Sequence, residues 1–312
     1  MLPPTISVRH RSHTWFIVLL ILTGIVPAQV QTNPAAVERQ WVELGQVHWL
    51  RNYEQARRQA RQSGRAIFIL FQEVPGCATC RNFGRDVLSR PLMVAAIENE
   101  FVPLAIHNNK SGHDARILNQ FREAAWNNPV VRIVTDQGVD LVPRLAGDYR
   151  AIAVYRTMTA ALNAQSRPIP QYMQLLGAEL HAANKAHIQT DYFSMNCFWS
   201  GEAALGAIQG VLDTRAGFMH GQEVVKVIYD TQTLSRDGLV RQARQLQFTR
   251  QPVDGTWRHA VQDEDYYLQQ SPLRYLNLSR LQATRINSSL GLRQNPMIYL
   301  SPDQRKIADS KK

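Results

Sequence analysis

The first half of the chain alternates between helical patterns and short, wholly apolar runs. A helical pattern at residues 53–63 precedes an unbroken apolar run at residues 67–71. Such a run suits a strand that is buried on both faces. Helical patterns at residues 78–88 and 91–100 then lead to a second apolar run at residues 101–106. We expect the two strands to pair in parallel through this crossover.

A helix and a hairpin are expected to follow this unit. Residues 114–125 form another helical pattern, and Pro129 precedes an apolar run at residues 130–134. The segment Asp136-Gln137-Gly138 is a turn signal. It predicts a hairpin in which residues 139–142 form the second strand.

The second half of the chain repeats the step from strand to helix. A strand pattern at residues 188–193 precedes helical spacing at residues 203–208. Strand patterns at residues 210–218 and 223–230 follow, and a helical stretch at residues 234–245 comes after them. This βαββα order predicts a ferredoxin-like α/β sandwich.

These patterns predict an α/β protein of two domains, since a domain usually holds about 100 to 200 residues. We assign residues 37–165 to the first domain and residues 186–312 to the second. A linker rich in Ala, Gln and Pro at about residues 163–171, followed by a helical stretch, is expected to separate them. Residues 271–293 carry a helical pattern that predicts one packing helix, with Pro272 at its start.

Residues 1–28 have the features of a secretory signal peptide. A basic region precedes the apolar run Trp15–Val26, and small residues follow at Val26-Pro27-Ala28. The run reaches only about 18 Å, well short of the ~30 Å hydrocarbon core of a membrane. We therefore expect export to the periplasm or cell envelope, with membrane contact only through an uncleaved signal.

Composition narrows the classes of partner. Apolar residues make up 45% and charged residues 19%, which excludes a polytopic membrane protein and wholesale disorder. The net charge is +10, but the basic residues are scattered, and the densest cluster, Arg57, Arg58 and Arg61, has the spacing of a solvated helix face. We expect no nucleic-acid partner. The chain has no nucleotide or metal motif, so no cofactor and no metal are expected.

The chain has 3 cysteines, too few for a disulfide scaffold in an exported protein of this size. Cys77 and Cys80 form a C-x-x-C motif at a predicted helix start, and Cys197 lies at another. Free N–H groups and the helix dipole favour a thiolate at such a place, so we assign Cys77 as nucleophile and Cys80 as resolving thiol. A zinc half-site or an inert disulfide is the alternative, but the chain has no second cysteine pair.

The order of elements from Trp41 to about Leu145 resembles the thioredoxin-like fold. The segment Val74–Cys80 is similar, more narrowly, to a thioredoxin-like family whose members often carry selenocysteine where Cys77 stands. The resemblance implies that Cys77 is the attacking group. It also implies that Pro129 is the cis-proline that faces the active cysteines and contacts substrate.

In the second half, residues 190–246 resemble A-type peptide methionine sulfoxide reductases. The matching positions are Cys197-Phe198-Trp199, Glu202, Gly210-Val211, Ala216-Gly217-Phe218, Glu223-Val224-Val225 and Tyr229-Asp230. The resemblance implies that Cys197 attacks the sulfoxide sulfur, that Glu223 protonates the departing oxygen, and that the Phe198-Trp199 pair seats the methyl group. A carboxyl beside aromatic rings would have a raised pKa.

Each resemblance has departures. Gly76 replaces the usual tryptophan before the C-x-x-C motif, and Phe71 stands where thioredoxins have a buried acid. In the second half, Asn196 replaces a glycine, and a tyrosine-bearing segment is missing where residues 219–222 form a short loop. Tyr266 or Tyr267, in a segment similar to the reductases' Glu-Asp-Tyr-His-Gln, is a candidate substitute.

The two resemblances together predict a relay between the halves. Attack on a sulfoxide would leave a sulfenic acid on Cys197, and the second half has no other cysteine to reduce it. Cys77 would attack this sulfur and Cys80 would resolve the mixed disulfide. The expected partners are an oxidised protein or peptide substrate and an unidentified dithiol electron donor. The alternatives are a thiol-disulfide oxidoreductase with a degenerate reductase-like binding domain, or a non-enzymatic envelope binding protein.

Overall fold

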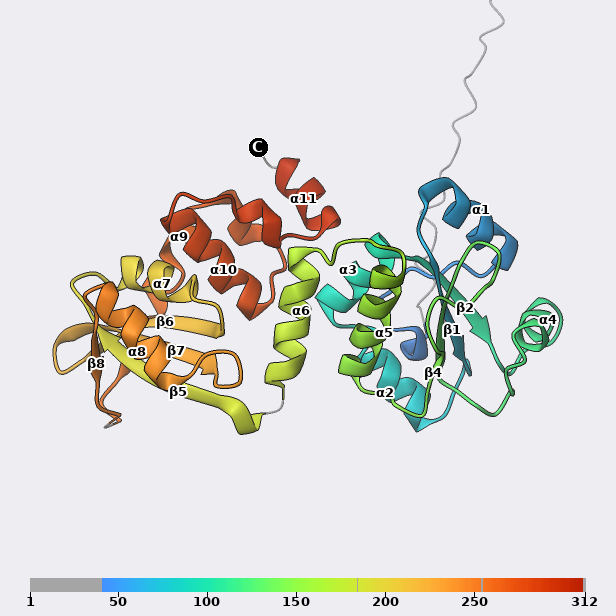
Figure 1. Ribbon diagram of the computed structural model, residues 1–312, viewed down its shortest axis with the longest axis horizontal. Coiled ribbons are helices and arrows are strands. Elements are labelled where there is room, and N and C mark those ends of the chain that lie inside the picture. Colours follow the sequence, from blue (N-terminus) through green and yellow to red (C-terminus); the bar gives the residue numbers. More distant parts are fainter. Residues whose placement is uncertain (1–40, 184, 254, 311–312) are drawn as a thin grey trace, which may run out of the picture. The chain divides into compact units, whose positions relative to one another are not determined.

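The computed structural model describes residues 41–183, 185–253 and 255–310 (Figure 1). The predicted signal peptide, residues 1–28, lies outside the described residues. Among those that are described, no helix combines the length and the apolar character needed to cross a membrane. The described residues belong to one compact unit, and they form two β-sheets.

The first sheet has the strand order β2-β1-β3-β4. Its strands are β1 (Ile67–Gln72), β2 (Val102–His107), β3 (Val130–Val134) and β4 (Leu145–Ala146). As predicted, β1 pairs in parallel with β2, and every residue of β1 is buried. The antiparallel partner of β1 is β3.

Helices cover both faces of this sheet. They are α1 (Tyr53–Ser63), α2 (Ala78–Asp86), α3 (Pro91–Glu100), α4 (His113–Gln120) and α5 (Ala151–Ala164), and a 3₁₀ turn, η1 (Val42–Leu44), precedes them. Ile69 and Phe71 belong to one apolar cluster with residues of α1 and α4, whereas Leu70 belongs to a second cluster with residues of α3 and α5. Because successive side chains of a strand point to opposite faces, β1 lies between a layer formed by α1 and α4 and a layer formed by α3 and α5.

Two predictions in this half are wrong in detail. The turn at Asp136-Gln137-Gly138 forms, but residues 139–142 make only an isolated bridge at Asp140, and the second strand is β4 instead. Pro143 has no N–H to donate to a ladder, which explains why pairing resumes only after it. Helix α4 ends at Gln120 and not at Ala125, because Arg122 adopts a left-handed backbone (φ 51°) that no helix accommodates.

The second sheet is antiparallel throughout, with the strand order β8-β5-β7-β6-β9. Its strands are β5 (Ile188–Ser194), β6 (Val211–Met219), β7 (Gln222–Asp230), β8 (Thr249–Gln251) and β9 (Arg258–His259). Helix α7 (Phe198–Gly206) follows β5, and α8 (Arg236–Gln245) follows β7. The predicted βαββα order is therefore present, with β8 as a further strand.

Helix α6 (Gln171–Ala182) was expected to belong to a separating stretch, but it is a core element. Its residues Tyr172, Met173 and Leu176 are buried in the apolar cluster that includes Leu70 of β1, and Leu281 of α10 (Arg280–Gly291) joins the same cluster. Helix α6 contacts α3, α5 and α10 (Figure 1). The apolar cluster next to the first sheet thus extends through α6 to α10.

The predicted single helix at residues 271–293 is divided into η4 (Pro272–Tyr275) and α10. Ser279 breaks it, because its side chain accepts a hydrogen bond from the backbone of Gln282 while the Gln282 side chain accepts one from the Ser279 backbone. The remaining short elements are η2 (Lys185–His187), η3 (Val261–Asp263), α9 (Tyr266–Gln269), η5 (Pro296–Tyr299) and α11 (Pro302–Asp309).

Candidate functional site

The C-x-x-C motif lies at the step from β1 to α2. Cys77 is the N-cap of α2, has an extended backbone and is exposed, whereas Cys80 is one turn further and buried. Both are free thiols, with their Sγ atoms 3.8 Å apart. The structure therefore has one accessible thiol, Cys77, and one covered thiol, Cys80.

The surroundings of the two thiols shift their pKa values in opposite directions. The backbone N–H of Cys80 is the largest influence that lowers the pKa of Cys77, with a smaller contribution from Thr79. Burial, together with the hydrogen bond to Cys77, raises the pKa of Cys80 to about 12. As the pH rises, the thiolate therefore forms on Cys77 first, while Cys80 keeps its proton.

The buried thiol has a specific partner in the loop before β3. The Sγ of Cys80 donates to Oδ1 of Asn128 at 2.7 Å, and the Asn128–Pro129 peptide bond is cis, as the resemblance implied for Pro129. Pro129 thus directly follows the residue that contacts Cys80. The Val74–Pro75 bond, within the motif loop, is cis as well.

Two buried polar side chains, those of Glu43 and Gln72, form hydrogen bonds with the backbone of the motif loop and of the segments next to it. Glu43 of η1 accepts a hydrogen bond from the backbone N–H of Gly76 at 2.9 Å. Gln72 donates to the backbone carbonyls of Glu43 and Cys80. A Cβ on Gly76 would lie 2.3 Å from the Glu73 carbonyl oxygen, so the departure from tryptophan at this position follows from close packing.

The second cysteine site is built at the start of α7. Cys197 is the half-buried N-cap of this helix. The backbone N–H of Phe198 donates to the Glu223 carboxylate at 2.7 Å, and the Glu223 carbonyl accepts a hydrogen bond from Met195. The structure therefore brings Glu223, on β7, to the helix terminus that carries Cys197.

An aromatic group adjoins this terminus. Phe198 is buried against Phe218 in an edge-to-face contact, so it belongs to the core. Trp199 is half-buried and stacks on Tyr266 with ring centroids 4.0 Å apart and planes 13° from parallel. Its indole N–H donates to Asp263 at 3.2 Å. Of the two tyrosines that were candidates from the sequence, Tyr266 is the one stacked on Trp199.

A buried charged network fixes Tyr266 relative to α7. The Glu202 carboxylate, on α7, accepts a hydrogen bond from the backbone N–H of Asp265 at 3.0 Å. Burial, and then the negative charge of Asp265, raises the pKa of Glu202 to about 9. Arg280 of α10 pairs with both Asp265 and Asp213. The segment before Tyr266 is thereby tied to two helices.

Two comparisons with known proteins bear on the class of this chain. Residues 48–136 match a protein family described as thioredoxin-like. The chain is also similar to the peptide methionine sulfoxide reductase MsrA of Methanococcus maripaludis, with 33% identity over 72 residues. Both comparisons point to an oxidoreductase. The second match covers 18% of this chain and 46% of the relative, so the chain spans less than half of that protein's length.

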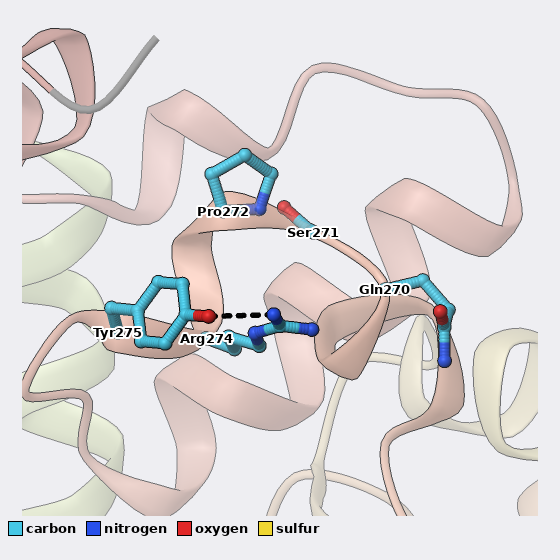
Figure 2. Close-up of a pocket in the computed structure, with 5 residues that line it drawn as sticks. All are labelled: Gln270, Ser271, Pro272, Arg274 and Tyr275. Carbon is cyan, nitrogen blue, oxygen red and sulfur yellow. Dashed lines mark hydrogen bonds between the residues drawn. The ribbon is translucent and has the colours of Figure 1, made fainter.

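A surface pocket of about 540 Å³ beyond α9 contains none of the candidate residues. It is lined by Gln270, Ser271, Pro272, Arg274 and Tyr275 (Figure 2). Two of these lining side chains contact each other, since the Arg274 guanidinium donates a hydrogen bond to the Tyr275 hydroxyl at 2.6 Å (Figure 2). We assign no role in the redox chemistry to this pocket.

Sequence reasoning missed the residues that support the C-x-x-C motif. Glu43, Gln72 and Asn128 reach the motif from η1, from β1 and from the loop before β3. Gln72 and Asn128 have local signals, because Gln72 directly follows a predicted strand and Asn128 precedes the predicted cis-proline. Glu43 has none, since it lies in a short turn outside any periodic pattern.

Proposed function

We propose that the chain is an exported thiol oxidoreductase that reduces methionine sulfoxide in proteins or peptides, and that its own dithiol regenerates the reductase cysteine. The observation that carries the proposal is the 2.7 Å contact between the Phe198 N–H and the Glu223 carboxylate, which brings an acid to the helix terminus of Cys197. The match to a methionine sulfoxide reductase supports it. The strand order β8-β5-β7-β6, which is that of ferredoxin-like folds, supports the predicted domain type.

The first step is the reduction of the sulfoxide. The Cys197 thiolate attacks the sulfoxide sulfur, and Glu223 gives a proton to the sulfoxide oxygen. The sulfur–oxygen bond breaks, the oxygen ends on Cys197 as a sulfenic acid, and the substrate leaves as a sulfide. Cys197 is oxidised by two electrons and the substrate is reduced by two. The exposed part of the Trp199–Tyr266 pair gives the methyl group an apolar seat.

The second step returns Cys197 to the thiol. The Cys77 thiolate attacks the sulfenic sulfur, a Cys77–Cys197 disulfide forms, and hydroxide leaves and is protonated to water. Cys80 then attacks Cys77, its proton passes to the released Cys197 thiolate, and a Cys77–Cys80 disulfide remains. The opposite pKa shifts of the two thiols favour this order of attack. An external dithiol donor must reduce the final disulfide.

A second candidate function is thiol-disulfide exchange on other proteins, with the second half as a binding module. The connection from β6 to β7 favours it, because His220-Gly221 forms a tight turn where the reductases have their tyrosine-bearing segment. In this alternative the Cys77–Cys80 pair carries all of the chemistry.

The deciding experiment is turnover of a methionine sulfoxide peptide with dithiothreitol as reductant. We expect turnover by the wild type, its loss in Cys197→Ser, and a reduction of about 100-fold or more in Glu223→Gln, since general acid catalysis contributes factors of this size. The exposed Glu54→Gln serves as the matched control. Turnover that persists in Cys197→Ser would refute the reductase proposal and leave thiol-disulfide exchange. Export is tested separately, by fractionation of cells and sequencing of the mature N-terminus.

A further inference from the structure

Glu73 places a third potential ligand next to the two thiols of the C-x-x-C motif. One carboxylate oxygen of Glu73 and the Sγ atoms of Cys77 and Cys80 all lie within 4.8 Å of one another. Glu73 is half-buried in the loop that leaves β1, and the relay gives this carboxylate no task. Sulfur and carboxylate oxygen are both ligands that zinc accepts in proteins.

The spacing of the two sulfur atoms fits a tetrahedral ion without rearrangement. A zinc–sulfur bond is about 2.3 Å long, so two sulfurs at the tetrahedral angle lie ~3.8 Å apart. The Sγ atoms of Cys77 and Cys80 are 3.8 Å apart. A carboxylate oxygen about 2.1 Å from the same ion lies ~3.6 Å from each sulfur, which is within the observed limit for Glu73.

We propose that the reduced motif is a binding site for Zn²⁺, with Cys77, Cys80 and Glu73 as its protein ligands. Cys77 faces solvent, so water completes the tetrahedron from that side. Two zinc–sulfur bonds form, each thiol gives up its proton to solvent if it still carries one, and no atom changes its oxidation state. The hydrogen bond from Cys80 to Asn128 is lost in this step, because the metal replaces the thiol proton.

Zinc bound in this way would block nucleophilic attack by the Cys77–Cys80 dithiol. The metal occupies the lone pairs with which Cys77 attacks, and a Cys77–Cys80 disulfide no longer offers two thiolate ligands. Zinc and the oxidised partner of the relay therefore compete for one state of the motif, the free dithiol. This inference goes beyond the proposed function and does not depend on the reaction at Cys197.

The test uses the purified chain in a Cys197→Ser background, so that the only thiols are those of the motif. The reduced protein is titrated with Zn²⁺ against a chromophoric chelator, and Co²⁺ is used as a spectroscopic probe. We expect one ion per chain, with the intense visible bands of tetrahedral cobalt and a charge-transfer band from two thiolates. Glu73→Gln is expected to weaken zinc binding by about tenfold or more, and Cys80→Ser to abolish stoichiometric binding.

Two results would overturn the inference. Zinc affinity in Glu73→Gln equal to that of the parent and of the Glu54→Gln control would remove Glu73 from the ligands. No stoichiometric binding by a parent that titrates with two free thiols would remove the site altogether. Circular dichroism of each variant separates loss of a ligand from loss of the fold. Because no sulfoxide substrate is used, the outcome is independent of the turnover assay.

Discussion

Replacement of the buried Glu202 by glutamine should stabilise the protein at neutral pH. Burial raises the pKa of Glu202 from 4.5 to about 9, so the folded chain holds this proton where the unfolded chain releases it. An acid with a raised pKa contributes its full stability below the unfolded value and loses it as the pH rises towards the folded value. The loss is about 1.4 kcal/mol per pH unit in this range.

The magnitude at pH 7 follows from these two values. Between pH 4.5 and 7, the wild type should lose about 3 kcal/mol of unfolding free energy through Glu202 alone. Glutamine has nearly the shape of the protonated acid, and its carbonyl oxygen can still accept the hydrogen bond from the Asp265 N–H. Glu202→Gln should therefore be close to neutral at pH 5 and stabilising at pH 7.

Urea unfolding of the two proteins at pH 5, 6, 7 and 8 measures this effect. The difference between the variant and the wild type is the relevant quantity, because the titration of all other groups largely cancels in it. The exposed Glu54→Gln should show no such pH dependence. A constant difference between Glu202→Gln and the wild type across this range would refute the argument that Glu202 is protonated in the fold.

Two further predictions concern the C-x-x-C motif. Iodoacetamide at pH 7 should modify Cys77 at least ~100-fold faster than Cys80, because the pKa of Cys77 is lowered, that of Cys80 is raised, and Cys80 is also buried. Peptide mass spectrometry after a short exposure measures both rates, and equal rates would contradict the assigned roles. Gly76→Ala should lower the free energy of unfolding by about 1 to 3 kcal/mol, because its Cβ would lie 2.3 Å from the Glu73 carbonyl oxygen. Gly64→Ala is the control in the same unfolding assay, because Gly64 has open space around it but a left-handed backbone, so this variant reports backbone strain without overpacking. Unchanged stability of Gly76→Ala would contradict the close packing.

The sequence was sufficient for those parts of the fold that local signals determine. The buried strand before Cys77 and the helix after it follow from apolar runs and short motifs, whereas the cis bond at Pro129 was implied by the resemblance to the thioredoxin-like fold. Strand β4 could not be placed, because its pairing begins only after Pro143 and its position depends on β3. Helix α6 was misread as part of a separator, since its apolar face does not reveal which core it enters.

The candidate sites divide in the same way. Cys77 and Cys197 could be singled out because each lies at the start of a predicted helix, and Cys80 because it completes a C-x-x-C motif with Cys77. Residues that adjust the thiols could not be found from spacing alone, since Asn128 contacts Cys80 across 48 positions of the sequence. The role of Glu73 is also tertiary, although it lies only four residues before Cys77, because the direction of its side chain depends on the course of the loop.

The two helix termini that carry cysteines use their free N–H groups differently. At α2 the backbone of Cys80 and Thr79 turns towards the Cys77 sulfur and lowers its pKa. At α7 the first free N–H, that of Phe198, binds the Glu223 carboxylate. One terminus thereby favours a thiolate on its N-cap cysteine, and the other binds a carboxylate at the residue that follows its N-cap cysteine. In the proposed relay both termini carry an attacking thiol, Cys77 at α2 and Cys197 at α7, and the α7 terminus also holds the carboxyl group that would give the proton.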